Sequence, residues 1–274
     1  MSFKNIFLLF AIVFATSFSY KKITWVAIGD SITYLNEHAD ETGNRITKGY
    51  MTMVTEQLPN IKYINQGHNG WTSGNIADAI EKLGIVKADV YSVFLGTNDW
   101  WQGKAIGTIS DYQNNTGSGT VYGSFKIIIN KLRSLNSKAK IILITPLQRS
   151  DFVYINDFKN NAYGSYKEKN SQSLAQFAEA ISAIGKYEKC TVVDLYNKSG
   201  ITQQNLVKYK RVKDPTTAGG YRNFAYPDFT NIPFNPDTDE YPYPADAIDM
   251  TYDGLHPSDK GNKIIADMLV KALK

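Results

Sequence analysis

The chain has 274 residues, of which 43% are hydrophobic, and its formal net charge is +4. This length suits one large α/β domain or two small ones, and the composition supplies a sizeable core. The charges are scattered and no Lys/Arg-rich run occurs, so a nucleic-acid-binding protein is excluded and no nucleic-acid partner is expected.

Residues 1–19 are predicted to be a secretory signal peptide. Lys4 precedes an apolar run at 6–14, and small residues follow at 15–17. A basic start, a short apolar run and a small-residue site are typical of a cleaved signal. The run is too short to span a bilayer as a helix, although an uncleaved anchor is the alternative. We therefore expect residues 20–274 to be secreted or periplasmic, with no stable membrane span after signal removal.

Cys190 is the only cysteine, so an internal disulfide is excluded. It opens a short apolar run, which favours a buried structural thiol over a nucleophile. With one cysteine and three histidines, a Cys/His zinc site of the usual spacing is excluded. We expect no metal and no cofactor.

Strand and helix patterns alternate along the chain. Strands are expected at 23–28, 61–65, 89–95, 140–145 and 190–193, and helices at 49–58, 75–83, 121–135, 166–187 and 258–273. The strands are nearly continuous apolar runs, which are typical of a parallel sheet covered on both faces. The predicted fold class is α/β, a three-layer α/β/α sandwich with a parallel sheet of about five strands.

Residues 205–252 depart from this alternation and are rich in proline and tyrosine. A loop of this length is uncommon unless it is functional or disordered. Its aromatic residues argue against disorder. We interpret it as a long ordered loop or small cap inserted late in a single domain that spans residues 20–274.

The first strand ends at Gly29-Asp30-Ser31, which places a hydroxyl at the tip of a tight turn. Open α/β sheets bind ligands at the carboxyl ends of their strands. Taken alone, Ser31 fits the N-cap of a following helix better than a catalytic role, because Asp and Ser favour caps. Later stretches of the chain change this interpretation.

Two more strand ends and the stretch before the last helix carry groups that are useful for acyl transfer. Gly70 offers a backbone N–H without a side chain, and Asn98 offers a side-chain amide. Asp253 precedes His256 by three residues, a spacing that can let a carboxylate orient an imidazole toward a serine. An ester hydrolase needs this set of nucleophile, base, orienting acid and oxyanion donors.

Four blocks resemble those of the SGNH, or GDSL-type, serine hydrolase superfamily. They are Gly29-Asp30-Ser31-Ile32, residues 65–70, Gly96-Thr97-Asn98-Asp99 and Asp253-Gly254-Leu255-His256, and they occur in the family's order. The resemblance implies a flavodoxin-like fold. By position, it implies that Ser31 is the nucleophile, His256 the base and Asp253 the acid. It also implies an oxyanion hole formed by the N–H groups of Ser31 and Gly70 and the side chain of Asn98.

Several neighbouring residues have more than one interpretation. Gly67 competes with Gly70 as the oxyanion glycine, and Gly70 is preferred because it precedes Trp71-Thr72-Ser73, the family's place for that residue. Asp30 and Asp99 are expected to fix their turns through hydrogen bonds to backbone N–H groups. The remaining histidines, His38 and His68, are expected to be loop or surface residues.

Two residues depart from the family pattern, and one of them, Trp71, bears on the substrate pocket. Ile32 replaces the usual leucine conservatively, whereas Trp71 follows Gly70 where many members carry a polar residue. We predict that Trp71 and Trp100 line the substrate pocket, with core positions for the Trp100-Trp101 pair as the alternative. Residues 205–252 have no family block to guide their interpretation.

The predicted function is a secreted, metal-independent serine esterase. Its partner would be a small-molecule or glycan ester, with acetylated carbohydrate preferred because aromatic residues lie near the expected site. A lipase or lysophospholipase is the alternative enzyme. A sugar-binding protein without catalysis and a flavin-binding flavodoxin are alternatives of other classes. The complete set Ser31, Asn98, Asp253 and His256 argues against the former. The turn after the first strand is short for a flavin phosphate, which argues against the latter.

Overall fold

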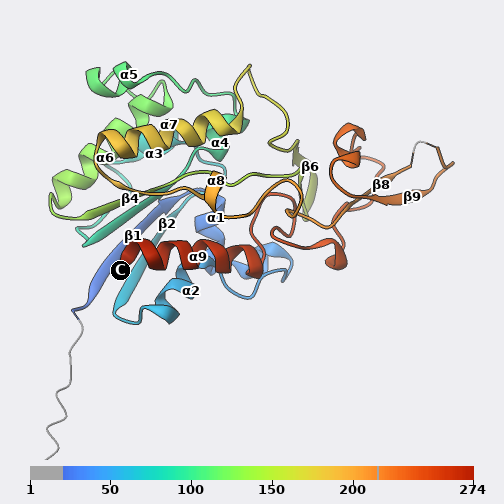
Figure 1. Ribbon diagram of the computed structural model, residues 1–274, viewed down its shortest axis with the longest axis horizontal. Coiled ribbons are helices and arrows are strands. Elements are labelled where there is room, and N and C mark those ends of the chain that lie inside the picture. The colour runs from blue at the N-terminus through green and yellow to red at the C-terminus, as the bar shows by residue number, and fades with distance from the viewer. Residues whose placement is uncertain (1–20, 215) are drawn as a thin grey trace, which may run out of the picture.

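The structure, a computed structural model, describes residues 21–214 and 216–274, so the predicted signal peptide lies outside the described residues. A five-stranded sheet has the strand order β2-β1-β3-β4-β7, and all neighbouring strands are parallel (Figure 1). Its strands are β1 (Ile23–Gly29), β2 (Ile61–Gly67), β3 (Val90–Phe94), β4 (Lys140–Ile144) and β7 (Thr191–Val193). The prediction of a five-stranded parallel α/β sandwich is confirmed.

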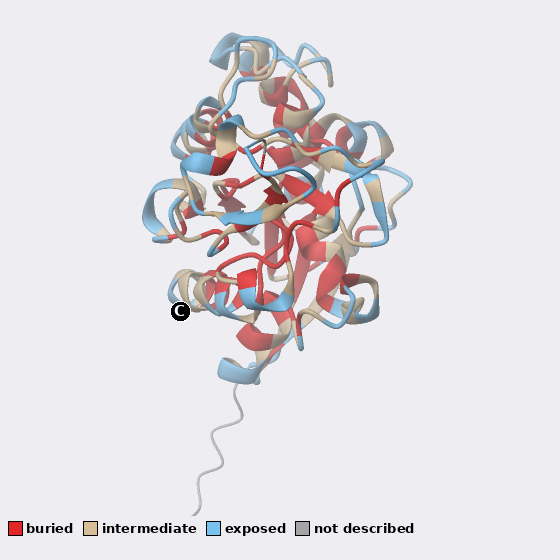
Figure 2. Ribbon diagram, turned by 90° about the vertical axis from the view of Figure 1, so that its right-hand side faces the viewer, coloured by how far each residue is buried: buried red, intermediate tan, exposed pale blue. Residues whose placement is uncertain are grey.

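Helices cover both faces of this sheet. On one face α2 (Tyr50–Gln57) packs against α9 (Asp259–Leu273). On the other face lie α3 (Ser73–Ala79), α6 (Val121–Leu135) and α7 (Leu174–Tyr187) (Figure 1). Two buried apolar clusters fill the spaces between the sheet and each helical layer, and Figure 2 shows this buried interior framed by exposed outer surfaces. None of the helices within the described ranges is long and apolar enough to cross a bilayer.

The major helices begin where a hydroxyl side chain caps the first turn. The side chains of Thr72, Thr120, Ser173 and Ser258 each accept a hydrogen bond from the N–H three residues later. These caps correct two predicted bounds. The helix predicted at 166–187 begins only at Leu174, after Ser173, and the helix predicted at 75–83 runs from Ser73 to Ala79. Residues 166–173 are instead a loop that lies beside the site.

Several short elements were not predicted. They are α1 (Ser31–Tyr34), α4 (Thr97–Trp101), α5 (Ile109–Asn114), α8 (Leu195–Lys198), the hairpin β5 (Phe152–Tyr154) and β6 (Asp157–Ala162), and 3-10 helices at Leu35–Glu37 and Ala39–Thr42. The prediction for Cys190 is corrected as well. Its side chain is half-buried at the start of β7 and only partly packed against the core.

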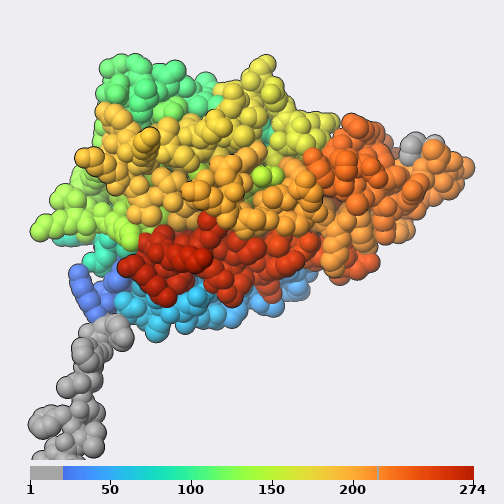
Figure 3. Space-filling view, viewed as in Figure 1, coloured from blue at the N-terminus to red at the C-terminus, as the bar shows by residue number. Residues whose placement is uncertain are grey.

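The stretch 205–252 contains regular structure. It holds a hairpin of β8 (Lys210–Lys213) and β9 (Tyr221–Phe224) and 3-10 helices at Asp228–Asn231 and Ala245–Ala247. We call residues 205–252 the insertion. In Figure 3 it forms a projection at one end of the molecule, beyond the carboxyl ends of the strands. It is therefore a small cap with its own hairpin.

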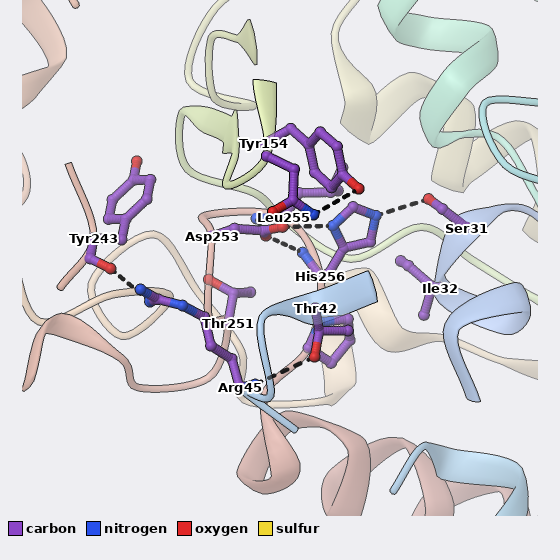
Figure 4. Close-up of polar contacts among 12 residues, drawn as sticks. Ser31, Ile32, Thr42, Arg45, Tyr154, Tyr243, Thr251, Asp253, Leu255 and His256 are labelled. Carbon is purple, nitrogen blue, oxygen red and sulfur yellow. Dashed lines mark hydrogen bonds and ion pairs between the residues drawn. The ribbon is translucent and has the colours of Figure 1, made fainter. Parts of the chain in front are cut away.

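A buried ion pair fixes the insertion to the rest of the chain. The ammonium of Lys210, whose side chain is 1% exposed, lies 2.5 Å from the carboxylate of Asp151. Asp151 also accepts hydrogen bonds from the hydroxyl of Tyr166 and from the N–H of Gly164, at 2.8 Å for Gly164. These partners offset the cost of removing two charges from water. The backbone of Tyr243 is held too, because its carbonyl accepts a hydrogen bond from Arg45 at 2.6 Å (Figure 4).

Candidate active site

Ser31 is presented at the start of α1, directly after β1. The N-cap of this helix is Asp30, whose carboxylate accepts a hydrogen bond from the N–H of Ile32 at 3.0 Å. Gly29 is required before it, because a Cβ there would lie 2.1 Å from the hydroxyl of Thr33. The interpretation of Ser31 as the cap is therefore wrong. With Asp30 in that role, the Ser31 hydroxyl is left for another partner.

That partner is His256, which comes from the turn before α9. The Nε2 atom of His256 lies 2.8 Å from the Oγ atom of Ser31, and its Nδ1 atom lies 2.7 Å from Asp253 (Figure 4). The second oxygen of Asp253 accepts hydrogen bonds from the N–H groups of Leu255 and His256, at 3.0 and 2.7 Å. The carboxylate is thus held by three contacts and has little freedom to turn.

The turn from Asp253 to His256 requires a glycine at position 254. Gly254 has a φ of +89°, and a Cβ at this position would lie 1.9 Å from the carbonyl oxygen of Asp151. The imidazole is wedged between two rings, stacked on Tyr252 and edge-on to Phe152, at centroid distances of 5.8 and 5.4 Å. An Nδ1–H donated to Asp253 leaves Nε2 free to accept a proton from Ser31. The arrangement can therefore activate a serine hydroxyl.

Gly70 lies in the loop after β2 and Asn98 in α4, the short helix after β3, and both reach the same place. The amide of Asn98 donates one hydrogen bond to the carbonyl of Trp71, at 3.1 Å, which leaves its second N–H for another acceptor. Gly70 has a φ of +74°, in the left-handed region that favours glycine. Ser31, Gly70 and Asn98 all line one pocket with His256. Together they can supply N–H groups to an oxyanion above Ser31.

Hydrogen bonds between these two loops hold the donors in place. Asp99 accepts from the N–H and the hydroxyl of Ser73, at about 2.9 and 2.6 Å respectively. The amide of Gln102 donates to the carbonyl of Gly70 at 2.9 Å. Asp99 therefore binds a backbone N–H as expected, but it joins two loops and does not fix its own turn alone.

The shared pocket has a volume of about 430 Å³, within the range of small-molecule sites. Its polar lining includes Asn69, Gln102, Arg149 and Asn160, and its apolar lining includes Phe152, Tyr154, Tyr252 and Leu255. Within the described residues, no group of three or more His, Cys, Asp or Glu side chains is placed to hold a metal ion. The pocket is thus suited to a small, partly polar molecule.

The two tryptophans that were predicted to line the pocket lie elsewhere. Trp100 is 0% exposed within the core, and its indole N–H donates to the carbonyl of Gln172 at 3.1 Å. Trp71 is not a lining residue, because its ring stacks on His68 at 4.3 Å and packs partly against the core. The prediction for both is wrong. Trp101, the neighbour of Trp100, lines the pocket instead.

Arg149 is a pocket residue that sequence reasoning missed. It follows β4 by five residues, and its position beyond a strand end was the only available signal. Its side chain is buried, and its guanidinium lies 5.7 Å from the ring centre of Trp101 and 5.9 Å from that of Phe152. Burial lowers its pKa to about 10, opposed by the negative charges of Asp253 and Asp151. Arg149 therefore supplies a buried positive charge to the pocket, close enough to Asp253 and Asp151 to feel their negative charges.

Asp30 is the second buried charge beside Ser31. Burial raises the pKa of this carboxyl from 3.8 to about 6, partly offset by the hydrogen bond from the N–H of Ile32. Between these pH values the folded protein retains a proton that the unfolded chain has lost. The free energy of unfolding therefore falls as the pH rises through this window, by roughly 3 kcal/mol for a shift of about two units.

Asp30→Asn is expected to remove this pH dependence while keeping the cap, since the amide oxygen can still accept from Ile32. The difference in melting temperature, variant minus wild type, should be about 5 to 10 °C larger at pH 7.5 than at pH 4.5. Thermal unfolding followed by circular dichroism at both pH values measures this. A difference that stays constant across pH would show that Asp30 is already ionised at pH 4.5.

Comparisons with known proteins agree with this geometry. Residues 27–264 match the model of the GDSL-like lipase/acylhydrolase family. A solved structure from Chitinophaga pinensis, described as a possible lipase, is 63% identical, with a TM-score of 0.91 and coverage of 92% of this chain and 98% of that one. No curated protein matches the chain.

More distant solved structures share the fold. An acetyl xylan esterase is 20% identical, with a TM-score of 0.54, over 92% of this chain and 100% of that one. A lipase/acylhydrolase from Enterococcus faecalis is 17% identical, with a TM-score of 0.51, over 92% and 95%. The family match spans most of the sequence, so the chain belongs to the GDSL-like lipase/acylhydrolase family and is a carboxylic ester hydrolase.

Proposed function

We propose that this chain is a secreted serine esterase that removes short acyl groups, chiefly acetyl, from carbohydrates. The observation that carries the proposal is the continuous line of contacts from Asp253 through His256 to Ser31, which opens into a small pocket with both polar and apolar lining residues. Secretion rests on the signal-like pattern of residues 1–19.

In this mechanism the Oγ atom of Ser31 attacks the ester carbonyl while the Nε2 atom of His256 takes its proton. The N–H groups of Ser31, Gly70 and Asn98 stabilise the negative charge that develops on the carbonyl oxygen. His256 then gives its proton to the departing alcohol, and an acyl-serine remains. Water, activated by the same imidazole, releases the acid and restores Ser31.

The polar residues that line the pocket favour a substrate with a short acyl group and a polar alcohol. Asn69, Asn98, Gln102 and Asn160 all border it, so a long alkyl chain would leave several polar groups without partners. Hydroxyl groups of a sugar could bind the same amides. The distant acetyl xylan esterase shares the fold alone, and its substrate is compatible with this proposal.

A lipase is the second candidate, because the Chitinophaga pinensis relative at 63% identity is described as a possible lipase. The preferred length of the acyl chain distinguishes the esterase from the lipase. We expect kcat/KM for 4-nitrophenyl acetate to exceed that for the decanoate at least tenfold, with the butyrate between them. Acetate release from acetylated xylan and pectin then tests the alcohol.

The outcomes are distinct. If decanoate is preferred over acetate by tenfold or more, the carbohydrate proposal is wrong and the lipase takes its place. If acetate is preferred but neither glycan releases acetate, the short-acyl part stands and the sugar part fails.

A further inference from the structure

A second pocket adjoins the one that contains Ser31. It has a volume of about 490 Å³, and it shares Trp101, Phe152 and Ala162 with the first pocket. We call it the outer pocket. The two hollows therefore meet along a common wall, and a molecule larger than a single small ester could occupy both.

The insertion builds one side of the outer pocket. Residues 230–234 of the insertion line it together with residues 161–163, 166 and 167. Phe234 is half-buried, with its ring 6.3 Å from that of Phe158 on the β5–β6 hairpin. Two segments that distinguish this chain from the bare sheet-and-helix frame thus meet to form a recess beside the catalytic serine.

The lining of the outer pocket combines ring faces with polar groups. Trp101, Tyr163, Tyr166 and Phe234 supply aromatic surface, and Asn161, Thr230, Asn231 and Lys167 supply hydrogen-bonding groups. A sugar ring presents both features, since its C–H groups pack on aromatic faces and its hydroxyls need donors and acceptors. An acyl chain would cover Asn161, Asn231 and Lys167 without offering them hydrogen-bond partners.

The recess is held in shape from behind. Tyr166 donates its hydroxyl to Asp151, and Asp151 forms the buried pair with Lys210 of the insertion. Rings that are already fixed lose little freedom when a ligand binds, so they favour affinity. The ring of Tyr166 is therefore held in place before a ligand binds, through a carboxylate that is itself tied to the insertion.

We propose that the outer pocket is a subsite for a carbohydrate chain, which binds sugar units next to the unit that carries the scissile ester. This inference rests on the proposed function and adds a preference for oligomeric over monomeric substrates. Because neither Ser31 nor His256 lines the outer pocket, the added contacts would act on substrate binding more than on chemistry.

The first test is the dependence of kcat/KM on sugar chain length. Singly acetylated xylo-, manno- and galacturono-oligosaccharides of one to four units are compared with 4-nitrophenyl acetate. For at least one of the series, we expect about a tenfold rise in kcat/KM between one and three units, chiefly through KM. Cleavage of acetylated monosaccharides without any gain with length would overturn the subsite and leave the proposed function standing. If neither monomers nor oligomers are cleaved, the proposed function itself fails, and the subsite with it.

The second test uses Phe234→Ala with Phe224→Ala as its matched control. Both residues are half-buried phenylalanines of the insertion, but only Phe234 lines the outer pocket. Phe234→Ala should abolish the gain with chain length and leave 4-nitrophenyl acetate hydrolysis unchanged, whereas Phe224→Ala should preserve both. Equal losses in the two variants would assign the effect to the packing of the insertion and overturn the subsite.

Binding without turnover gives an independent readout. In Ser31→Ala, unacetylated trisaccharides of the same three series should bind, as measured by calorimetry and by the intrinsic tryptophan fluorescence, to which Trp101 contributes, and Phe234→Ala should weaken the binding. If Phe234→Ala instead lowers hydrolysis of decanoyl esters alone, the outer pocket holds an acyl chain and the carbohydrate assignment is wrong.

Discussion

Ser31→Ala is expected to lower kcat for ester hydrolysis by at least about 10³-fold, since no other group can form the acyl-enzyme. The fold should be unaffected, because the N-cap of α1 is Asp30. Within the described residues, the Ser31 hydroxyl forms its side-chain hydrogen bond with His256 alone. Initial rates with 4-nitrophenyl acetate, together with the melting temperature, measure both effects.

A covalent probe provides the control for this prediction. A fluorophosphonate should label wild type at Ser31 and should not label Ser31→Ala. Ser137→Ala, at an exposed position on the loop before β4, should be labelled and should turn over substrate like wild type. Turnover by Ser31→Ala at the wild-type rate would contradict the catalytic assignment altogether.

Asn98→Ala is expected to lower kcat by about 10²- to 10³-fold, the size seen for the loss of one oxyanion donor. KM should change little, because the contact strengthens only as charge develops in the transition state. Steady-state kinetics with 4-nitrophenyl acetate separates the two parameters. A rise in KM alone would mean that Asn98 binds the substrate and does not stabilise the oxyanion.

The same substitution also removes the hydrogen bond from Asn98 to Trp71. Gln102→Ala is the matched control, because it breaks another link between the same loops, the one to Gly70, without removing an oxyanion donor. We expect it to cost less than tenfold in kcat. A loss as large as that of Asn98→Ala would assign the effect to displaced loops.

Much of the frame follows from patterns along the chain. The strands could be predicted because strands buried on both faces are nearly continuous apolar runs, as at 90–94, where Ser92 is the one small polar residue, and at 141–144. The long helices could be predicted from apolar positions every three to four residues. Helix bounds depended on single capping hydroxyls. The helix predicted at 166–187 begins only after Ser173, because residues 167–172 are all polar and Asn170 and Ser171 have positive φ values, which a helix does not allow.

The site was partly predictable, because its polar groups follow strand ends or precede the last helix. The orientation of its tryptophans was not. Consecutive residues on a helix point about 100° apart, so Trp100 and Trp101 could not both face the pocket. The five-residue helix α4 gives too short a pattern to tell which. Arg149 and the insertion depend on contacts between distant segments, which local patterns do not encode.

The buried pair of Lys210 and Asp151 sets a rule for transplanting this cap between relatives. Because the two charges come from segments 59 residues apart, exchanging the insertion alone for one without Lys210 would leave the carboxylate of Asp151 without its ammonium partner. The exchangeable unit is residues 149–166 together with 205–252. A chimera that respects this boundary keeps the Lys210–Asp151 pair whole, and it also transfers Phe152 and Tyr252, the two rings that hold the His256 imidazole.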